Sequence, residues 1–342
     1  MIKLLERLCC THGVSGREDE ICKVIYDEMS NLADNVKIDH NNNVIAQMGR
    51  VDRYNIMLDA HIDQIGFIVT YIDDNGFLKV SPVGGMDYRT VQDSRFKVCT
   101  ESGNITAVAC CLPPHLSDGG EDKAPDSDSI FLDTGMPKES VEKLVQLGDT
   151  VVMNVTPAEL LNGRFTCCAT DNRACCALLI RVAQLLKESP TNVGVTFAFT
   201  SQEETYGKGA LTSAYTISPN EAIAADVSFA RQGGVADHEA GALEGGAMIC
   251  ISPVLSRKMS YKLIDIAKDN SIPYQLEIVG GLTGTDADKI STVKSGIPTA
   301  LVSIPQRNMH TAAEIISAAD IENTAQLICK YIENRAGEID EC

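Results

Sequence analysis

The sequence predicts an α/β fold, in which helices cover a β-sheet and a small β domain interrupts the chain. Apolar runs typical of strands alternate with helical patterns over residues 1–66 and again after Asp171, and this alternation is typical of a helix-covered sheet. Between these two parts, short alternating runs separated by turns replace the helical pattern. Such runs are typical of antiparallel β structure.

The first part of the chain predicts two helices followed by strands. Apolar residues recur at helical spacing over 2–8 and again over 21–29, and Ser15 and Glu18 have the spacing of a capping box before the second helix. Three extended runs follow, at 36–38, 44–48 and 54–58. The last of these runs leads directly into His61, so a polar cluster is expected at a strand end.

The inserted part predicts a small β domain over residues 67–162. Its clearest strand candidates are 67–71, 77–80 and 96–100. A helical pattern returns only at about 138–145, and the acidic, glycine-containing stretch 116–128 predicts a surface loop. After Asp171 an apolar helix through 178–186 is followed by strand candidates at 193–200, 222–225 and 299–304.

Charge and hydropathy limit the classes of partner. The formal net charge is −18, which disfavours nucleic acid and anionic membranes because both require a basic face. No stretch has the roughly 18 to 20 consecutive apolar residues of a membrane span, and the first residues lack the apolar core of a signal peptide. We therefore expect a cytoplasmic protein that acts on small molecules or peptides.

The chain contains 13 cysteines, an odd number that argues against a disulfide scaffold in a long chain without a secretion signal. Four adjacent pairs lack the two-residue spacer that lets thiolates converge on one zinc ion. They are Cys9-Cys10, Cys110-Cys111, Cys167-Cys168 and Cys175-Cys176. We expect reduced thiols that serve as small buried packing residues.

Ligand-type side chains follow four of the predicted strands, and a fifth opens the long helix. These residues are His61, Asp171, Glu204, Asp226 and His310. In an α/β sheet, functional groups gather beyond the carboxyl ends of the strands. Two imidazoles and several carboxylates, without thiolates, suit two divalent ions such as zinc or cobalt, held about 3.5 to 4 Å apart.

Two further carboxylates have predicted roles beside these ligands. Asp63 stands two residues after His61, on the same side of an extended segment, so it can accept the imidazole N–H and orient the ring. Glu203 precedes Glu204, and because neighbouring side chains diverge, one of the pair can bind metal while the other faces the reacting water.

These residues resemble a known family, the glutamyl and deblocking aminopeptidases with dinuclear metal sites, which include the tetrahedral aminopeptidases and some relatives labelled endoglucanases. The matching motifs span nearly the whole chain. They are Gly13-Val14-Ser15-Gly16, Ala60-His61-Ile62-Asp63-Gln64-Ile65-Gly66-Phe67, Gly84-Gly85-Met86-Asp87, Pro113-Pro114-His115, Asp171-Asn172-Arg173, Gln202-Glu203-Glu204, Asp226-Val227, Gly284-Thr285-Asp286-Ala287, and His310 with Glu314.

The resemblance implies a role for each site residue. Asp171 would bridge two metal ions, with His61 and Asp226 completing one site and Glu204 and His310 the other. Glu203 would be the general base that activates a metal-bridged water, beside Asp63 as the residue that orients His61. The substrates would be peptides with a free N-terminus, and the loop carrying Thr285 and Asp286 would border the pocket for the first side chain.

The resemblance also implies the domain arrangement. Residues 1–66 and 163–342 would form a mixed-sheet dinuclear-zinc aminopeptidase domain, and residues 67–162 an inserted, β-barrel-like dimerisation domain. The dimers of such proteins can assemble into a dodecameric tetrahedral shell. Some positions depart from the usual motifs: Gln64 replaces a common Glu, Cys175 a common Gly, and 243–246 a more typical Leu-Gly-Lys-Gly.

Other functions compete with this interpretation. A related dinuclear deacylase or carboxypeptidase would use a similar site on another amide, whereas a glycosidase would need two carboxylates that flank a sugar bond and no metal. A non-enzymatic metal-binding assembly protein would have no use for the base Glu203. The sequence leaves the preferred N-terminal residue, the native metal and the choice between dimer and dodecamer open.

Overall fold

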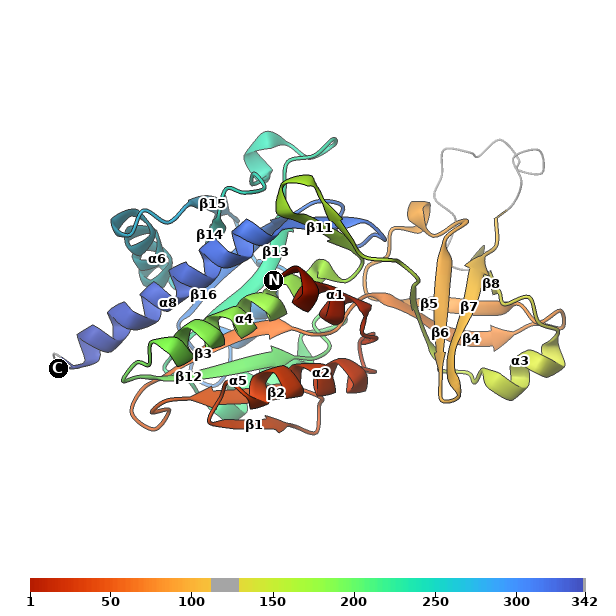
Figure 1. The fold of residues 1–342 in the computed structure, drawn as a ribbon, viewed down its shortest axis with the longest axis horizontal. Helices are drawn as coiled ribbons and strands as arrows, with labels where there is room; N and C mark the ends of the chain where they lie inside the picture. Colours follow the sequence, from red (N-terminus) through yellow and green to blue (C-terminus); the bar gives the residue numbers. More distant parts are fainter. Residues whose placement is uncertain (112–128, 341–342) are drawn as a thin grey trace.

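The computed structural model describes residues 1–111 and 129–340. A helix-covered sheet lies beside a closed β-barrel, joined to it by extended connections (Figure 1). The predicted α/β fold with an inserted β domain is confirmed. The expected acidic loop at 116–128 and the Pro113-Pro114-His115 motif lie outside the described residues.

The main sheet has eight strands in the order β1-β2-β12-β3-β13-β16-β14-β15. Their bounds, in that order, are Asn35–Ile38, Val44–Met48, Gly194–Thr200, Asn55–His61, Glu221–Phe229, Thr299–Gln306, Ala247–Ile251 and Tyr274–Ile278. The central strands β12, β3, β13 and β16 are mutually parallel, whereas β2 and β14 join them antiparallel. The sheet is therefore mixed, and its central strands end at one edge.

Helices cover both faces of this sheet unequally (Figure 1). The larger layer contains α1 (Ile2–Cys10), α2 (Asp19–Ser30), α4 (Thr170–Glu188), α6 (Arg257–Asp269) and α8 (Ala318–Asp340). The opposite face carries only α5 (Lys208–Ile217) and α7 (Asp286–Ile290). Two separate apolar clusters correspond to the two faces, so part of the second face stays uncovered by helix in the described chain.

The barrel contains six antiparallel strands in the order β4-β5-β8-β7-β6-β9 and closes because β4 pairs with both β5 and β9. The bounds in that order are Gly66–Ile72, Leu78–Val83, Phe131–Asp133, Gly103–Ala109, Arg95–Thr100 and Thr150–Met153. Phe67 and Phe96 meet edge to face inside it, with ring centroids 5.7 Å apart. The short helix α3 (Lys138–Leu144) packs beside β4.

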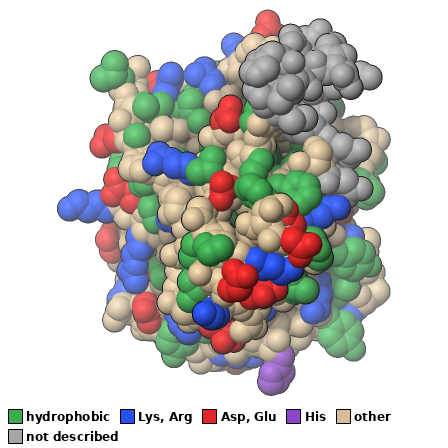
Figure 2. All heavy atoms as spheres, turned by 90° about the vertical axis from the view of Figure 1, so that its right-hand side faces the viewer, with side chains coloured by type: hydrophobic (Ala, Val, Ile, Leu, Met, Phe, Trp, Pro, Cys, Tyr) green, Lys and Arg blue, Asp and Glu red, His purple; other side chains and the backbone are tan. Residues whose placement is uncertain are grey.

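Two smaller features complete the fold. A three-stranded antiparallel sheet joins β10 (Ala158–Leu160), β11 (Arg164–Cys167) and β17 (Glu314–Ser317), and so leads the chain from the barrel back to α4. At the barrel end of the molecule, apolar side chains are exposed among acidic and basic ones (Figure 2). On the barrel itself, Tyr71 is 52% and Leu147 63% exposed.

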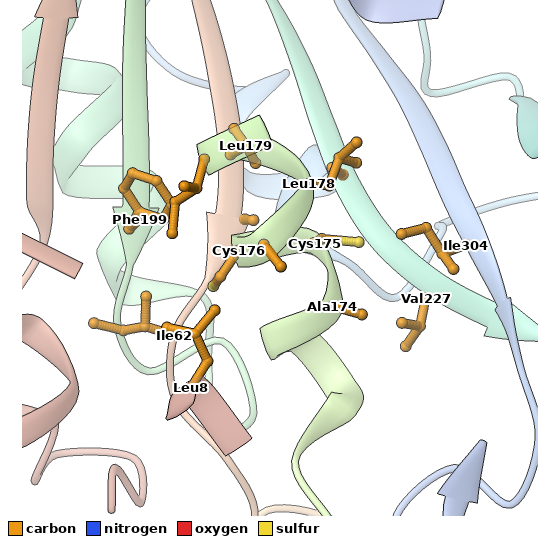
Figure 3. Close-up of a cluster of buried hydrophobic side chains, with 14 of the residues drawn as sticks. Leu8, Ile62, Ala174, Cys175, Cys176, Leu178, Leu179, Phe199, Val227 and Ile304 are labelled. Carbon is orange, nitrogen blue, oxygen red and sulfur yellow. The ribbon is translucent and has the colours of Figure 1, made fainter. Parts of the chain in front are cut away.

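Helix α4 is the centre of the core because small residues let it approach the sheet closely. Ala174, Cys175 and Cys176 are all fully buried and lie among side chains from α1, β12, β13 and β16 and near Ile62, which follows β3 (Figure 3). The Cys175 thiol donates to the carbonyl of Asp226 and the Cys176 thiol to that of His61, both at 3.1 Å. These cysteines tie the helix to two strands that carry predicted ligands.

The prediction for the other cysteine pairs is only partly confirmed. Cys167 and Cys168 are buried, as is Cys9. Cys10, Cys110 and Cys111 are exposed, so the expectation that these three are buried is wrong. Cys10 is the last residue of α1 and the other two follow the end of β7, so all three stand at the ends of their elements.

The predicted capping box is also wrong. The Ser15 hydroxyl donates to the carboxylate of Asp63 instead of accepting from the helix. Glu18 occupies the N-cap position of α2, but its side chain forms no capping hydrogen bond with the helix. Its carboxylate instead accepts a hydrogen bond from the Gly16 N–H at 2.7 Å. A tertiary partner therefore takes the place of the local hydrogen bond that the spacing suggested.

A buried arginine connects α4 to the N-terminal segment. Arg173 is fully buried and donates to the carbonyls of Leu8 at 2.8 Å and Thr11 at 3.3 Å. Its other contact is with the Gln64 side-chain oxygen at 3.5 Å. In the part of the chain described, its hydrogen bonds go only to neutral oxygens, and the nearby Asp63 favours the buried charge without accepting a hydrogen bond from it.

We therefore predict that Gln64→Glu stabilises the protein. The new carboxylate would face a buried guanidinium that lacks an anionic hydrogen-bond partner, and since breaking such a pair costs about 3 to 5 kcal/mol, forming it is expected to contribute about 1 to 2 kcal/mol after its own desolvation. Urea denaturation of wild type and variant at pH 7 measures the change. Gln64→Leu, which removes the oxygen, should be less stable; a lower midpoint for Gln64→Glu would contradict this account.

Candidate metal centre

The predicted ligands lie at the edge where the central parallel strands end. His61 is the last residue of β3 and pairs in register with Thr200, the last residue of β12. Glu204 follows β12 through a short loop, and His310 follows β16. Asp226 lies inside β13, three residues before its end at Phe229, so the expectation that it follows the strand is wrong. It still lies level with His61, because Ala224 pairs with Asp59 and β13 continues beyond the end of β3.

Asp171 stands between the two imidazoles. Its Oδ1 lies 3.3 Å from His61 Nε2, and its Oδ2 lies 3.4 Å from His310 Nε2. Each imidazole has a second carboxylate partner: Asp226 Oδ1 is 3.7 Å from His61 Nε2, and Glu204 Oε1 is 3.3 Å from His310 Nε2. The structure thus brings all five predicted ligands together as two groups that share Asp171.

The charge of this cluster fits divalent cations. Within each group, one ligand atom from every residue lies within 4.8 Å of the others. In the described chain, no lysine or arginine forms an ion pair with the carboxylates of Asp171, Glu203, Glu204 or Asp226, whose only cationic partners are the two imidazoles. Buried carboxylates that lack other cations, mixed with imidazole nitrogen, form a donor set suited to zinc, cobalt or manganese.

The buried Asp63 side chain organises the residues around the cluster. Its Oδ1 is 3.4 Å from His61 Nδ1 and accepts the backbone N–H of Glu203 at 3.0 Å. Its Oδ2 accepts the N–H of Glu204 at 3.1 Å and the Ser15 hydroxyl. Although burial would raise the pKa of Asp63, these partners lower it overall. The carboxylate therefore stays ionised and can orient the His61 ring.

Glu203 occupies a position that suits proton transfer. Its Oε2 lies 3.9 Å from His61 Nε2, and its side chain is 16% exposed toward the cavity that the site opens into. Burial, together with the neighbouring Asp286 and Glu204, raises the pKa of Glu203 to about 8. Burial also raises the pKa of Asp226, whereas the two imidazoles outweigh burial and lower that of Asp171.

Glu314 is a site residue for which the sequence suggested no role. Its buried Oε1 accepts the backbone N–H of His310 at 3.0 Å. Its Oε2 accepts the Asp171 N–H at 3.2 Å and the Thr170 hydroxyl at 3.0 Å. Glu314 thereby connects the backbones of two predicted ligands from distant segments. Its place four residues after His310 was the only signal available, and it does not reveal this contact.

The structure gives a reason for the two adjacent glycines of the Gly84-Gly85-Met86-Asp87 motif, which had no assigned function. A Cβ on Gly85 would lie 3.1 Å from His310 Nδ1, and one on Gly84 would lie 3.4 Å from Glu204 Oε2. Gly84 also has a φ of +80°, which side chains rarely adopt. Two glycines let the segment after β5 run close to the cluster without displacing a ligand.

Thr285 and Asp286 have different surroundings. Thr285 lines the cavity and caps α7 by accepting the Ala287 N–H at 3.2 Å. Asp286 is 3% exposed, lies outside the cavity wall, and accepts the Thr200 hydroxyl at 2.9 Å. Burial and the nearby Asp59 raise its pKa. Of the two predicted substrate contacts, only Thr285 faces the cavity.

The cavity has a volume of about 1410 Å³ and opens from the ligand cluster along the sheet face beside α7, whose Lys289 lines it. Its walls include His61, Glu203 and His310 at one side, and residues of β13, β14, β15 and β16. The segment 243–246 and Cys175, where the chain departs from the resembled motifs, lie outside these walls. The space is large enough for several residues of an extended peptide.

Comparisons with known proteins place this chain among the aminopeptidases. The chain belongs to the M42 glutamyl aminopeptidase family, which matches residues 41–327. The lysyl aminopeptidase of Pyrococcus furiosus is 32% identical over 336 residues, which cover 97% of this chain and 96% of that protein. The protein is therefore an aminopeptidase, and the predicted enzyme class is confirmed.

Solved structures agree with this assignment. An aminopeptidase from Desulfurococcus kamchatkensis superimposes with a TM-score of 0.93 and 34% identity, covering 99% of this chain and 96% of that one. The TET1 peptidase of Pyrococcus horikoshii, described as assembling into a tetrahedron or a large octahedral shell, has a TM-score of 0.85 and 30% identity, covering 97% of this chain and 98% of that one.

Among the helices described here, none is both long and apolar enough to cross a membrane.

The hydrogen bonds of Asp63 lead to a prediction for Asp63→Asn. The amide would turn its NH₂ toward a backbone N–H of Glu203 or Glu204, so we expect a loss of about 2 to 4 kcal/mol in the free energy of unfolding and faster hydrogen exchange in the loop 201–206. Ser15→Ala, which removes one hydrogen bond, should cost only about 1 kcal/mol.

The loss of stability in Asp63→Asn is expected to depend on pH. Because the pKa of Asp63 is lowered in the folded protein, its contribution is present above the unfolded value of about 4 and is lost as the pH falls through the folded value. Denaturation curves at several pH values should therefore converge for wild type and Asp63→Asn in acid. Equal stability of the two proteins at pH 7 would refute the role of this carboxylate.

Proposed function

We propose that the protein is a two-metal aminopeptidase that hydrolyses the N-terminal residue from peptides. The observation that carries this proposal is the position of Asp171, whose two oxygens face two different imidazoles beside the carboxylate of Glu203. A dinuclear hydrolytic site is expected to have one carboxylate shared by two groups of ligands, each of which offers imidazole nitrogen and carboxylate oxygen.

In this proposal Asp171 bridges two divalent ions, zinc or cobalt by the chemistry of the donors. His61 and Asp226 complete one coordination sphere, and Glu204 and His310 complete the other, in agreement with the two groups of neighbouring ligand atoms. Bound at these residues, the ions would supply Lewis acidity and a water of lowered pKa at neutral pH.

Glu203 is the proposed general base. Its raised pKa and partial exposure to the cavity suit a group that accepts a proton from the attacking water and later returns it to the leaving amine. Asp63 acts through other groups: it fixes the His61 ring and the two backbone N–H groups beside it. We therefore assign Asp63 a positioning role.

The substrate proposal combines the cavity with the family assignment. A free amino end is expected because the family members are aminopeptidases, and the cavity that begins at the ligand cluster gives room for the first side chain. Thr285 is retained as a candidate contact with the substrate, whereas Asp286 is better described as a support for the end of β12 through Thr200.

We further propose that the chain self-associates, as a dimer or a dodecamer, through the barrel encoded by the inserted residues 67–162. The exposed Tyr71 and Leu147 on the barrel favour an interface there, and the TET1 relative forms large shells. Light scattering of the purified protein separates the two assemblies.

We also propose that the enzyme acts in the cytoplasm. Several of its cysteines are free thiols, which fits a reducing compartment. They include Cys9, Cys22, Cys250 and Cys329.

The shared position of Asp171 predicts different metal contents for two variants. Wild type is expected to retain two ions per chain, His310→Ala one, and Asp171→Ala none, since only Asp171 contacts both groups. Elemental analysis after dialysis measures the ratio. His238→Ala is the matched control, because this imidazole also lines the cavity but is 82% exposed and outside both groups. Two retained ions in Asp171→Ala would exclude its bridging role.

Substitution of Glu203 is expected to separate catalysis from metal binding. Glu203→Gln should lower kcat on aminoacyl fluorogenic substrates by at least about 100-fold, the usual effect of losing a general base, while keeping the metal content of wild type. Glu204→Gln should instead lose metal, because its carboxylate belongs to the second ligand group. Near-normal turnover by Glu203→Gln would remove Glu203 from this role, and no hydrolysis by the metal-loaded wild type would refute the proposed function.

A further inference from the structure

Apart from the carboxylates described above, the wall of the cavity contains Glu239, Asp288 and Glu277, the last of them on the edge strand β15. The pairing of the strands shows on which face of the sheet the Glu277 side chain lies. Asp226 pairs with Ser303, Ser303 pairs with Met248, and Cys250, two residues after Met248, pairs with Glu277. Because paired residues and alternate residues share a face, Glu277 lies on the same face of the sheet as the ligand Asp226.

The Glu277 carboxylate is held toward the inner part of the cavity. Its Oε1 accepts the hydroxyl of Ser228, and its Oε2 accepts that of Ser303 at 3.0 Å. Both serines are buried, at 7% and 0% exposure, and burial raises the pKa of Glu277. In the chain as described, no lysine, arginine or histidine forms an ion pair with it. The site therefore contains an acid that two neutral hydroxyls fix in place without neutralising it.

The distance between Glu277 and the ligand cluster matches a long side chain. Ser228, which contacts Glu277, stands two residues after Asp226 on β13, about 7 Å along an extended strand. A substrate whose first residue is bound at the ligand cluster would direct its side chain along this face. The four-carbon stem of lysine, or the stem and fork of arginine, spans such a distance and carries its charge at the far end.

The other charged groups of the cavity do not offer an equivalent site. Asp288 is occupied by the N–H groups of Thr283 and Gly284 and by the Thr283 hydroxyl. Glu239 is 65% exposed at the margin. Lys289 lies over the ring of Tyr206, 4.3 Å from its centroid, and that tyrosine is itself 66% exposed. The inner part of the cavity is therefore acidic, and its one lysine is on the solvent side.

We propose that this aminopeptidase prefers peptides whose first residue is lysine or arginine, and that the Glu277 carboxylate binds the cation of that side chain. The inference rests on the proposed function, because it needs the first residue to sit at the ligand cluster. Apolar cavity-lining residues on the same face of the sheet as Glu277, Met248 and Leu301, can contact the aliphatic stem.

The test compares lysyl, arginyl, norleucyl and glutamyl aminomethylcoumarin amides with cobalt-loaded enzyme. Norleucine is the matched substrate, since it keeps the straight stem and lacks the ammonium. We expect wild type to hydrolyse the lysyl and arginyl compounds with the highest kcat/KM. In Glu277→Gln the lysyl to norleucyl ratio should fall by about 100-fold, the effect of removing one partner of a desolvated ion pair. Glu239→Gln makes the same charge change at the margin and should alter the ratio less than about 3-fold, as expected of an exposed charge.

Each outcome bears on one conclusion. A preference for the glutamyl or norleucyl compound, an unchanged ratio in Glu277→Gln, or an equal fall in Glu239→Gln would overturn the inference and leave the aminopeptidase proposal intact. If no compound is hydrolysed, the proposed function fails, and calorimetric titration of the metal-loaded protein with lysinamide and norleucinamide decides the inference alone. Tighter binding of lysinamide that Glu277→Gln abolishes would support it; equal binding would refute it.

Discussion

The site depends on one buried carboxylate, that of Asp63. It is bonded to three segments that are far apart in the chain: the N-terminal loop through Ser15, the end of β3 through His61, and the loop after β12 through the N–H groups of Glu203 and Glu204. A single ionised group thus fixes an imidazole and the backbone that carries two neighbouring carboxylates. Its lowered pKa reflects these partners, since burial alone would favour the neutral acid.

Much of the fold and the ligand set could be predicted because both follow from local sequence patterns. Apolar runs identified the central strands, and ligand-type residues at their ends were expected to meet because parallel strands end at one edge. The roles of Glu314 and Glu277 could not be predicted in this way. Glu314 acts through backbone groups of His310 and Asp171, and Glu277 through hydroxyls on two other strands. Such contacts depend on tertiary geometry, as does the failure of the Ser15 capping box.

The acidic cluster implies a balance between stability and function. Burying several carboxylates without lysine or arginine partners raises the pKa of Glu203 and Asp226, which disfavours the folded state at neutral pH. Cations that bind only the folded arrangement would offset this cost by mass action. Structural support from elsewhere is also needed: the small residues of α4 bring Asp171 to the cluster, and its thiols fix the backbones of His61 and Asp226.

The inserted barrel also has a consequence for how the protein is made. It enters the chain at Gly66, directly after His61 and Asp63, and the chain reaches Asp171 only after the barrel strands are complete. His310, the last predicted ligand, is followed by β17 and the long helix α8, which packs against α4. During synthesis the barrel can fold as a unit long before the ligand cluster exists. The predicted ligand cluster is therefore complete only after nearly all of the chain has left the ribosome.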